Sequence, residues 1–261
     1  MKIFTFTFLL SILSFQSLLH AETLKATYGL FASGFEVVQV NGTFDVTDDK
    51  YNLKMDLETI GALGAVAPWS GRIQTIGIEN GAQSSPLEYS FASTWKGDTE
   101  TTKFIFNKDG KITSHTRRES DGQLITEKLD SDIYDGYPLD MMTAMYRAMN
   151  NPTCQVTPQV IDGKRKFDMA FQSKGFEVLK PSRYSRFSGK AEICEVEIIP
   201  VSGKWRDKPR GWMSIQEQAK DNGELPKIWF GRVRADMPPI PVRFYIKTNY
   251  GTMIMHLQSI Q

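Results

Sequence analysis

Side chains able to do acid–base, nucleophilic or metal chemistry are few in this sequence, and their spacing matches no familiar site. Its 261 residues include three histidines, and His115 and His256 lie far apart, outside any HExxH or paired arrangement. The segment Ala32–Phe35 lacks the first glycine of a GxSxG nucleophile turn, and no GxGxxG or Walker loop occurs. The sequence therefore predicts no metal, no cofactor and no catalytic residue, and an enzymatic activity stays uncertain.

An acidic loop offers the best alternative for chemistry. Asp130, Asp132 and Asp135 precede a glycine, as in a calcium-binding loop. The register of Asp135 is off by one, however, and Met141 stands where the closing glutamate belongs. The simpler interpretation is a polar loop whose Asp135 caps the next helix. Asp130, Asp132 and Asp140 would suit a hydrolase if two of them lay about 5–10 Å apart, a distance that sequence does not give.

The first 21 residues have the parts of a secretory signal peptide. Lys2 supplies a positive charge, an apolar run covers 3–15, and a more polar stretch ends at the small residue Ala21. The run is shorter than the roughly 20 residues that a membrane span needs, so an uncleaved anchor is the weaker alternative. We expect cleavage after Ala21, export to the periplasm, and a mature chain of residues 22–261 without a transmembrane segment.

The charge balance argues against nucleic acid as a partner. The sequence has 31 basic and 30 acidic residues, and removal of Lys2 with the signal peptide makes the two equal. Such a chain has no general attraction to nucleic acid or to anionic membranes. Its composition, 41% hydrophobic and 23% charged, is typical of a globular protein. The sequence leaves the oligomeric state open.

Export makes the two cysteines of the chain interpretable as a pair. Oxidising compartments favour disulfides, and Cys154 and Cys194 have no other possible partner. A redox or metal site is the alternative, but the two residues lack the CxxC spacing that such sites use. The sequence therefore predicts a structural disulfide between Cys154 and Cys194.

Two segments are candidates for contact with a ligand or partner. Residues 61–69, with Leu63 and Trp69, form an apolar stretch broken by glycine, which suits a flap over a cavity or a patch that touches lipid or protein. The alternative is a buried crossover between strands. Residues 204–212 combine basic side chains with two tryptophans, a mixture that suits phosphate groups or an acidic partner. The alternative there is a solvated loop with balanced charges.

Most of the chain has the pattern of a long antiparallel meander. Apolar and polar residues alternate with period two over 51–58, 166–172, 194–198, 242–247 and 253–257. Short turns with Asp-Gly or Asn-Gly separate such runs, and hairpins make consecutive strands antiparallel neighbours. About a dozen strands are expected, enough for a single sheet to curl or close. We therefore expect a mainly β protein with one domain over 22–261.

One helix interrupts the meander, at about 138–149. Pro138 suits a first helical turn, and Met142, Met145 and Tyr146 fall at helical spacing. The simplest arrangement is a curled sheet, or a barrel-like meander, wrapped around this one main helix. Its methionines are then core packing, or alternatively the lining of a ligand site, because methionine adapts to varied shapes.

A series of short motifs spans nearly the whole mature chain: Ala26–Leu30, Pro68–Trp69, Pro86–Tyr89, Tyr137–Asp140, Ile161–Asp168, Cys194–Val196, Ile199–Gly203 and Pro241–Arg243. Their order resembles an exported bacterial family known only as domain of unknown function 3108. The resemblance implies a periplasmic, largely β protein with a barrel-like curled sheet around a helix, and it brings no activity and no functional residues. The segment 212–229 departs from the family's pattern, so the resemblance does not fix the strand count there.

These features lead us to expect a non-enzymatic envelope protein that binds an apolar or lipid-like ligand. The side chains expected at the ligand or partner are Leu63, Trp69, Met142, Met145, Trp205, Arg206, Arg210 and Trp212. A scaffold that binds another envelope protein through a sheet edge is the first alternative. A carboxylate-dependent hydrolase is the second.

Overall fold

The computed structural model describes residues 23–205, 212–221, 223–249 and 251–261. The expected signal peptide, together with Arg206 and Arg210, lies outside these residues. The described part of the chain forms these elements in order: β1 (Leu24–Ala32), β2 (Phe35–Val46), β3 (Lys50–Thr59), α1 (Gly61–Val66), β4 (Trp69–Ile78), η1 (Gly81–Gln83), β5 (Ser85–Trp95), β6 (Asp98–Phe106), β7 (Ile112–Arg118), β8 (Leu124–Thr126), η2 (Asp132–Tyr134), α2 (Met141–Asn150), β9 (Gln159–Ile161), β10 (Arg165–Leu179), β11 (Gly189–Gly203), α3 (Trp212–Asp221), β12 (Lys227–Gly231), β13 (Ile240–Thr248) and β14 (Gly251–Ile260).

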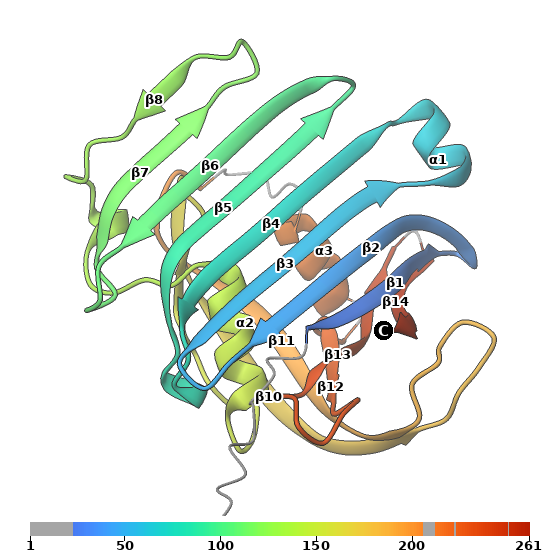
Figure 1. Ribbon diagram of the computed structural model, residues 1–261. Helices are drawn as coiled ribbons and strands as arrows, with labels where there is room; N and C mark the ends of the chain where they lie inside the picture. Colours follow the sequence, from blue (N-terminus) through green and yellow to red (C-terminus); the bar gives the residue numbers. More distant parts are fainter. Residues whose placement is uncertain (1–22, 206–211, 222, 250) are drawn as a thin grey trace, which may run out of the picture.

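The fourteen strands form one antiparallel sheet built from two meanders, β1–β8 and β9–β14 (Figure 1). Within each meander, consecutive strands are neighbours, as the hairpin signals predicted. The first and last strands then join the two meanders, with Tyr28 of β1 opposite Leu257 of β14. The sheet edges are therefore β8 and β9, which follow one another in the chain, and the sheet is not closed.

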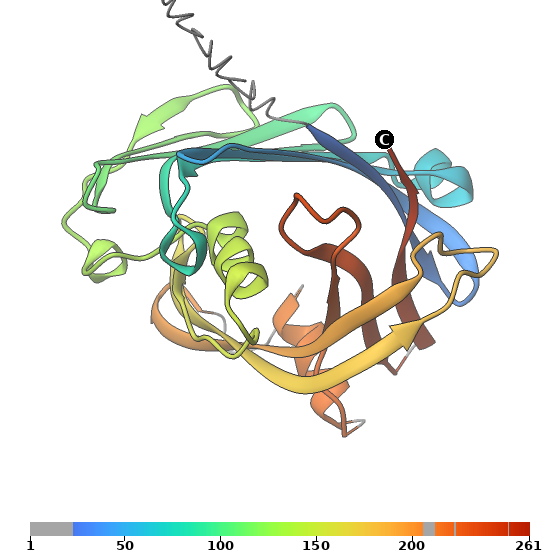
Figure 2. The same ribbon diagram turned by 60° about the horizontal axis from the view of Figure 1, so that its bottom comes forward.

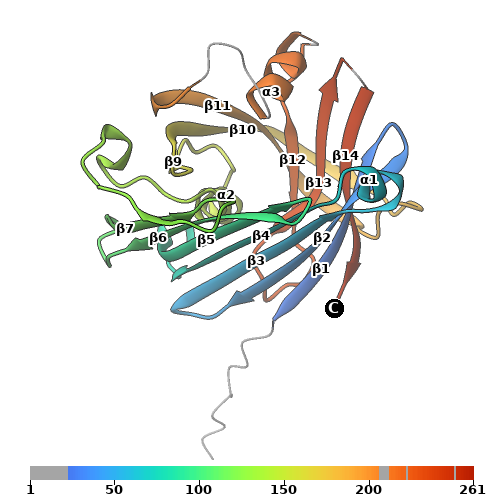
Figure 3. The same cartoon turned by 90° about the horizontal axis from the view of Figure 1, so that it is seen from above.

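The sheet curls until its two halves face each other (Figure 2). A sheet of this many twisted strands cannot stay flat, and the curl gives its inward side chains a shared core. Figure 3 shows α2 between the β9–β14 half and the β1–β8 half. The period-two segments predicted as strands are strands, and many of their apolar residues are buried, as for Phe167 and Phe171 of β10 and Val196 and Ile198 of β11.

The helices differ from the expectation in start and in number. Helix α2 begins at Met141 rather than at Pro138, because the Asp140 carboxylate accepts a hydrogen bond from the Thr143 N–H at 2.9 Å and so caps the helix. The prediction of a sheet wrapped around one main helix is not confirmed, since the described residues form three α-helices. Helix α3 packs against β11 and β13. It occupies the start of the segment 212–229, where the strand count was open.

The connection from β8 to β9 spans the gap between the two edges of the sheet and carries α2. It is fastened to the sheet by the predicted disulfide, which the structure confirms: Cys154 in the connection bonds Cys194 on β11, with Cα atoms 6.3 Å apart. The Glu192 carboxylate accepts the Cys154 N–H at 3.1 Å and the Ser173 hydroxyl at 2.6 Å. The covalent bond and these hydrogen bonds together hold the connection against β10 and β11.

Candidate functional site

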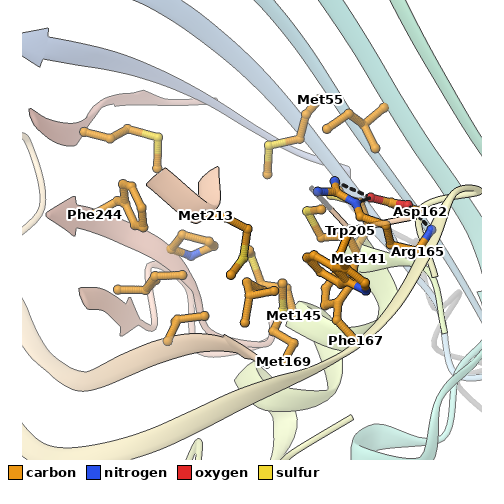
Figure 4. Close-up of a pocket in the computed structure, with 17 residues that line it drawn as sticks. Met55, Met141, Met145, Asp162, Arg165, Phe167, Met169, Trp205, Met213 and Phe244 are labelled. Atoms are coloured by element: carbon orange, nitrogen blue, oxygen red, sulfur yellow. Dashed lines mark hydrogen bonds and ion pairs between the residues drawn. The ribbon is translucent and has the colours of Figure 1, made fainter. Parts of the chain in front are cut away.

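A cavity of about 330 Å³ lies on the concave side of the sheet, between its two halves (Figure 4). Its wall comes from β3 and β4 on one side, from β10–β14 on the other, and from α2 and α3. The charged side chains among the described lining residues are Asp162 and Arg165; the rest of that lining is hydrophobic. Seven of the chain's 11 methionines line it, namely Met55, Met141, Met142, Met145, Met169, Met213 and Met255.

Strand register and helical spacing bring these methionines together. Met55 on β3 lies opposite Ile73 on β4, and Met255 on β14 lies opposite Phe244 on β13, so each pair shares the inward face. Met141 and Met145 are four residues apart on α2 and therefore share one helix face. Thioether side chains are unbranched and polarisable, so a wall of this kind adapts to ligands of varied shape.

A buried hydrogen-bond network fixes α2 in the cavity wall. The Asp140 side chain is fully buried and accepts hydrogen bonds from the Thr143 N–H, from the Thr143 hydroxyl at 2.6 Å and from the Thr75 hydroxyl at 3.2 Å. The Tyr51 and Thr143 hydroxyls are 2.7 Å apart. Burial raises the pKa of Asp140, while the hydrogen bonds from Thr143 and Thr75 act in the opposite direction. The first turn of α2 is thereby tied to β3 and β4.

Asp140→Ala is expected to lower the free energy of unfolding by about 2 kcal/mol, because it removes the helix cap and leaves buried hydroxyl groups unpaired. Asp135→Ala is the matched control, because the sequence favoured Asp135 as the helix cap. In the structure Asp135 is exposed and lies at the C-terminal end of η2. We expect the control to change stability by less than about 0.5 kcal/mol. Urea unfolding followed by circular dichroism measures both. Equal effects of the two substitutions would contradict the capping role of Asp140.

The polar rim of the cavity is an ion pair stacked on a tryptophan. The Arg165 Nε and Nη2 atoms donate to the same oxygen of Asp162 at 2.8 and 2.5 Å. The Arg165 guanidinium lies 4.9 Å from the centre of the Trp205 ring, a cation–π arrangement. The Trp205 indole N–H donates to the Ser202 carbonyl at 2.8 Å, and its ring meets Phe167 edge-on. The rim is therefore rigid and electrically neutral.

The structure brings together only part of the residues that the sequence pointed to. Met142, Met145 and Trp205 line the cavity. Leu63 and Trp69 do not line it; α1 has no buried residue, so the interpretation of 61–69 as a buried crossover is wrong. Arg206 and Arg210 lie outside the described residues, and Trp212 begins α3 with a side chain that the structure does not describe. Whether any of these residues contacts a ligand stays a prediction.

Sequence reasoning missed the rim pair and five methionines of the wall, one of which is Met141, the first residue of α2. Met55, Met169 and Met255 were expected on the inward faces of strands, but nothing local showed that these strands converge. Met213 lies in α3, which the sequence did not predict. The signal that was available is the concentration of methionine on predicted inward positions, and it points to an adaptable apolar wall.

The acidic residues considered for catalysis lie in different surroundings. Asp130 and Asp132 are exposed, whereas Asp140 is buried beside α2 with its hydrogen bonds taken by threonines. Within the described ranges, Cys154, Glu192 and Cys194 lie close enough together to resemble a metal site, but the two sulfur atoms are bonded to each other. Neither arrangement suggests hydrolysis or metal chemistry.

Comparison with known proteins places the chain in a family without an assigned role. No helix in the described part of the chain has the length and apolarity to cross a bilayer. No curated protein matches the sequence. Among solved structures, the chain is similar to a β-barrel-like protein of the domain of unknown function DUF1849 from Brucella abortus, at 10% identity and a TM-score of 0.49, over 92% of this chain and 98% of that one. The model of the family described as "Protein of unknown function (DUF3108)" matches residues 23–258, and the chain belongs to that family.

Proposed function

We propose that this protein is an exported, non-enzymatic binding module that holds an apolar or lipid-like molecule in the methionine-lined cavity. The observation that carries the proposal is the wall itself, which is hydrophobic apart from one neutral ion pair at its rim. Ligand sites are commonly apolar hollows with a few fixed polar groups, and methionine is common at surfaces that accept varied ligands.

The size of the cavity narrows the class of ligand. Its volume of about 330 Å³ lies near the lower end of the range of about 300–1,000 Å³ that is typical of small-molecule sites. One small apolar molecule or a single alkyl chain fits such a volume better than a lipid with several chains. The rim at Asp162 and Arg165 then marks the place where a polar end of the ligand meets water.

An extracytoplasmic location is part of the proposal. The basic start and short apolar run of residues 1–21 support export. The Cys154–Cys194 disulfide supports an oxidising compartment, because such bonds seldom persist in the reducing cytosol. An apolar molecule that crosses the aqueous periplasm needs shielding from water, and a concave apolar wall supplies it.

Met145→Gln is expected to weaken the binding of N-phenyl-1-naphthylamine, an apolar fluorescent probe, by about tenfold. The substitution keeps the side chain's length but sets an amide without a partner in an apolar wall. Met145→Leu, which keeps the wall apolar, should bind as the wild type does. Met253→Gln is the matched control, because Met253 lies on β14 outside the lining. Probe titration of the delipidated protein measures all four, and equal affinities would contradict the assignment of the cavity.

Partner binding through a sheet edge is the second candidate. The observation that favours it is the open edge at β8, a three-residue strand that pairs with β7 alone and carries the exposed Leu124. Native mass spectrometry of protein purified without detergent separates the two candidates. A bound mass of lipid-like size favours the binding module, whereas a bare chain that also fails to bind the probe favours the scaffold.

A further inference from the structure

A second hollow adjoins the cavity and shares a thin wall with it. The hollow is a groove of about 610 Å³, lined in part by Gly163, Lys164, Gly203 and Lys204. The wall is made of the β9–β10 turn and the end of β11, where the Lys204 N–H donates to the Lys164 carbonyl at 2.9 Å. These two segments therefore contribute residues both to the cavity and to the groove.

The wall divides the residues of these two segments between the cavity and the groove. Asp162, Arg165 and Trp205 line the cavity, while their neighbours Lys164 and Lys204 line the groove. The two segments approach so closely because of the glycine that ends β11. A Cβ atom on Gly203 would lie 2.4 Å from the Lys164 carbonyl oxygen and 2.8 Å from the Arg165 Cα. Lys164 and Lys204 directly precede the rim residues Arg165 and Trp205 in the chain.

The groove retains positive charge that its own acidic residues do not neutralise. Arg117 is paired with Glu119 and Glu127, and its guanidinium, with a smaller contribution from Lys204, holds the pKa of Glu127 below its usual range. Among the residues that the structure describes, the groove's three lysines make no ion pair, and Asp130 is the one carboxylate there that also lacks one. The three lysines are Lys128, Lys164 and Lys204.

The rim pair cannot itself select the charge of a ligand. The Arg165 guanidinium is occupied by the Asp162 carboxylate. That carboxylate also accepts the N–H groups of Lys164 and Arg165 at 3.0 and 2.9 Å, which holds it in the turn. With this pair neutral, selection by charge falls to Lys164 and Lys204, the chain neighbours of the rim residues Arg165 and Trp205.

We infer that the ligand is a single-chain amphiphile with an anionic head group, its chain in the methionine-lined cavity and its carboxylate or phosphate at Lys164 and Lys204. The inference rests on the proposed function and adds the chemistry of the head group to it. Exposed ammonium groups attract an anion at the rim without a desolvation cost as large as that of a buried pair. Burial of the alkyl chain supplies most of the affinity, and the lysines supply the preference for an anionic head group.

The test compares four ligands with the same twelve-carbon chain: dodecanoate, dodecyl phosphate, dodecanol and dodecyltrimethylammonium. Each displaces N-phenyl-1-naphthylamine from the full-length mature protein, at concentrations below those at which it forms micelles. The two anions are expected to displace the probe at about tenfold lower concentration than dodecanol, and the cation at higher concentration. A difference between carboxylate and phosphate then identifies the head group. Added salt should narrow the gap between charged and neutral ligands.

The double substitution Lys164→Gln with Lys204→Gln is expected to abolish the preference for anions while the affinity for dodecanol stays unchanged. Lys108→Gln with Lys111→Gln is the matched control, since these lysines lie at the β6–β7 turn, line neither hollow and change the net charge equally. Equal displacement by all four ligands, or a preference that survives the first double substitution, overturns the inference and leaves the proposed function standing. A protein that binds neither the probe nor any ligand overturns both.

Discussion

Loss of the Cys154–Cys194 disulfide is expected to lower the free energy of unfolding by about 4 kcal/mol, the largest effect that we predict for a single structural feature. The bond closes a loop with a sequence separation of 40 residues, and the chain-entropy model assigns a loop of that length about this stabilisation. The position of the disulfide in the fold also favours a large stabilising effect. The disulfide ties the connection between the two sheet edges to β11, where Cys154 and Cys194 are both fully buried.

Urea unfolding of the oxidised protein and of the double variant Cys154→Ala with Cys194→Ala measures this effect. Alanine avoids the buried, unpaired hydroxyl groups that serine would introduce. A reductant should shift the unfolding midpoint of the wild type toward that of the variant and leave the variant itself unchanged. Before reduction, a thiol reagent should label neither cysteine. A midpoint that does not respond to reductant would contradict the stabilising role of the bond.

The strands could be predicted from the sequence because each carries its own signal. Alternation over 166–172 and 194–198 depends only on which face of a strand is buried, and both segments lie in strands of the structure. The pairing of β1 with β14 has no such local signal, since it joins residues at opposite ends of the chain. Turn residues indicate which strands are consecutive, but they do not indicate where two meanders meet. An apolar interior was expected, but the set of strands that lines the cavity depends on that meeting and could not be predicted.

The exposed helix α1 shows where a general rule misleads. Apolar runs are usually buried, and residues 61–69 were therefore assigned most readily to a crossover inside the fold. Four of the six residues of α1 are glycine or alanine, whose side chains offer little apolar area to bury. Exposing such a helix to water therefore costs little free energy, and the hydrophobicity of the segment did not determine whether it is buried. Its larger side chains, Leu63 and Val66, are exposed.

The start of α2 illustrates a competition between two helix signals. Pro138 fits a first helical turn, but Asp140 and Thr143 have the spacing of a capping residue and its hydrogen-bonded partner. The Asp140 side chain accepts a hydrogen bond from the Thr143 backbone N–H. Proline in a first turn makes no such bond; it only lacks an N–H that would have had no partner there. The helix therefore begins after Asp140.

Acid is expected to destabilise the protein by about 3 kcal/mol through one side chain, His115. The imidazole is fully buried, stacked on Phe104 at 4.4 Å, with its Nδ1 atom 2.7 Å from the Tyr134 hydroxyl. Burial lowers the pKa of His115 to about 4 from an ordinary 6.5; the nearby Glu127 acts against this shift, and Arg117 acts with it. The unfolded chain therefore binds a proton at a pH where the folded protein does not. This contribution to stability is complete above pH 6.5 and is lost as the pH falls through 4.

His115→Phe tests this assignment, because it keeps a ring against Phe104 and removes the titrating group. The free energy of unfolding, measured in urea at several values between pH 7 and pH 4, should fall by about 3 kcal/mol less in the variant than in the wild type. Carboxylates titrate in both proteins, so their contribution cancels in the difference. His256→Phe is the control: its pKa is also lowered by burial, but its side chain is only partly buried, so we expect a smaller change in slope. Identical pH profiles for His115→Phe and the wild type would show that His115 is not kept neutral by the fold. The His115 ring beside Phe104 would then be accessible to water in solution.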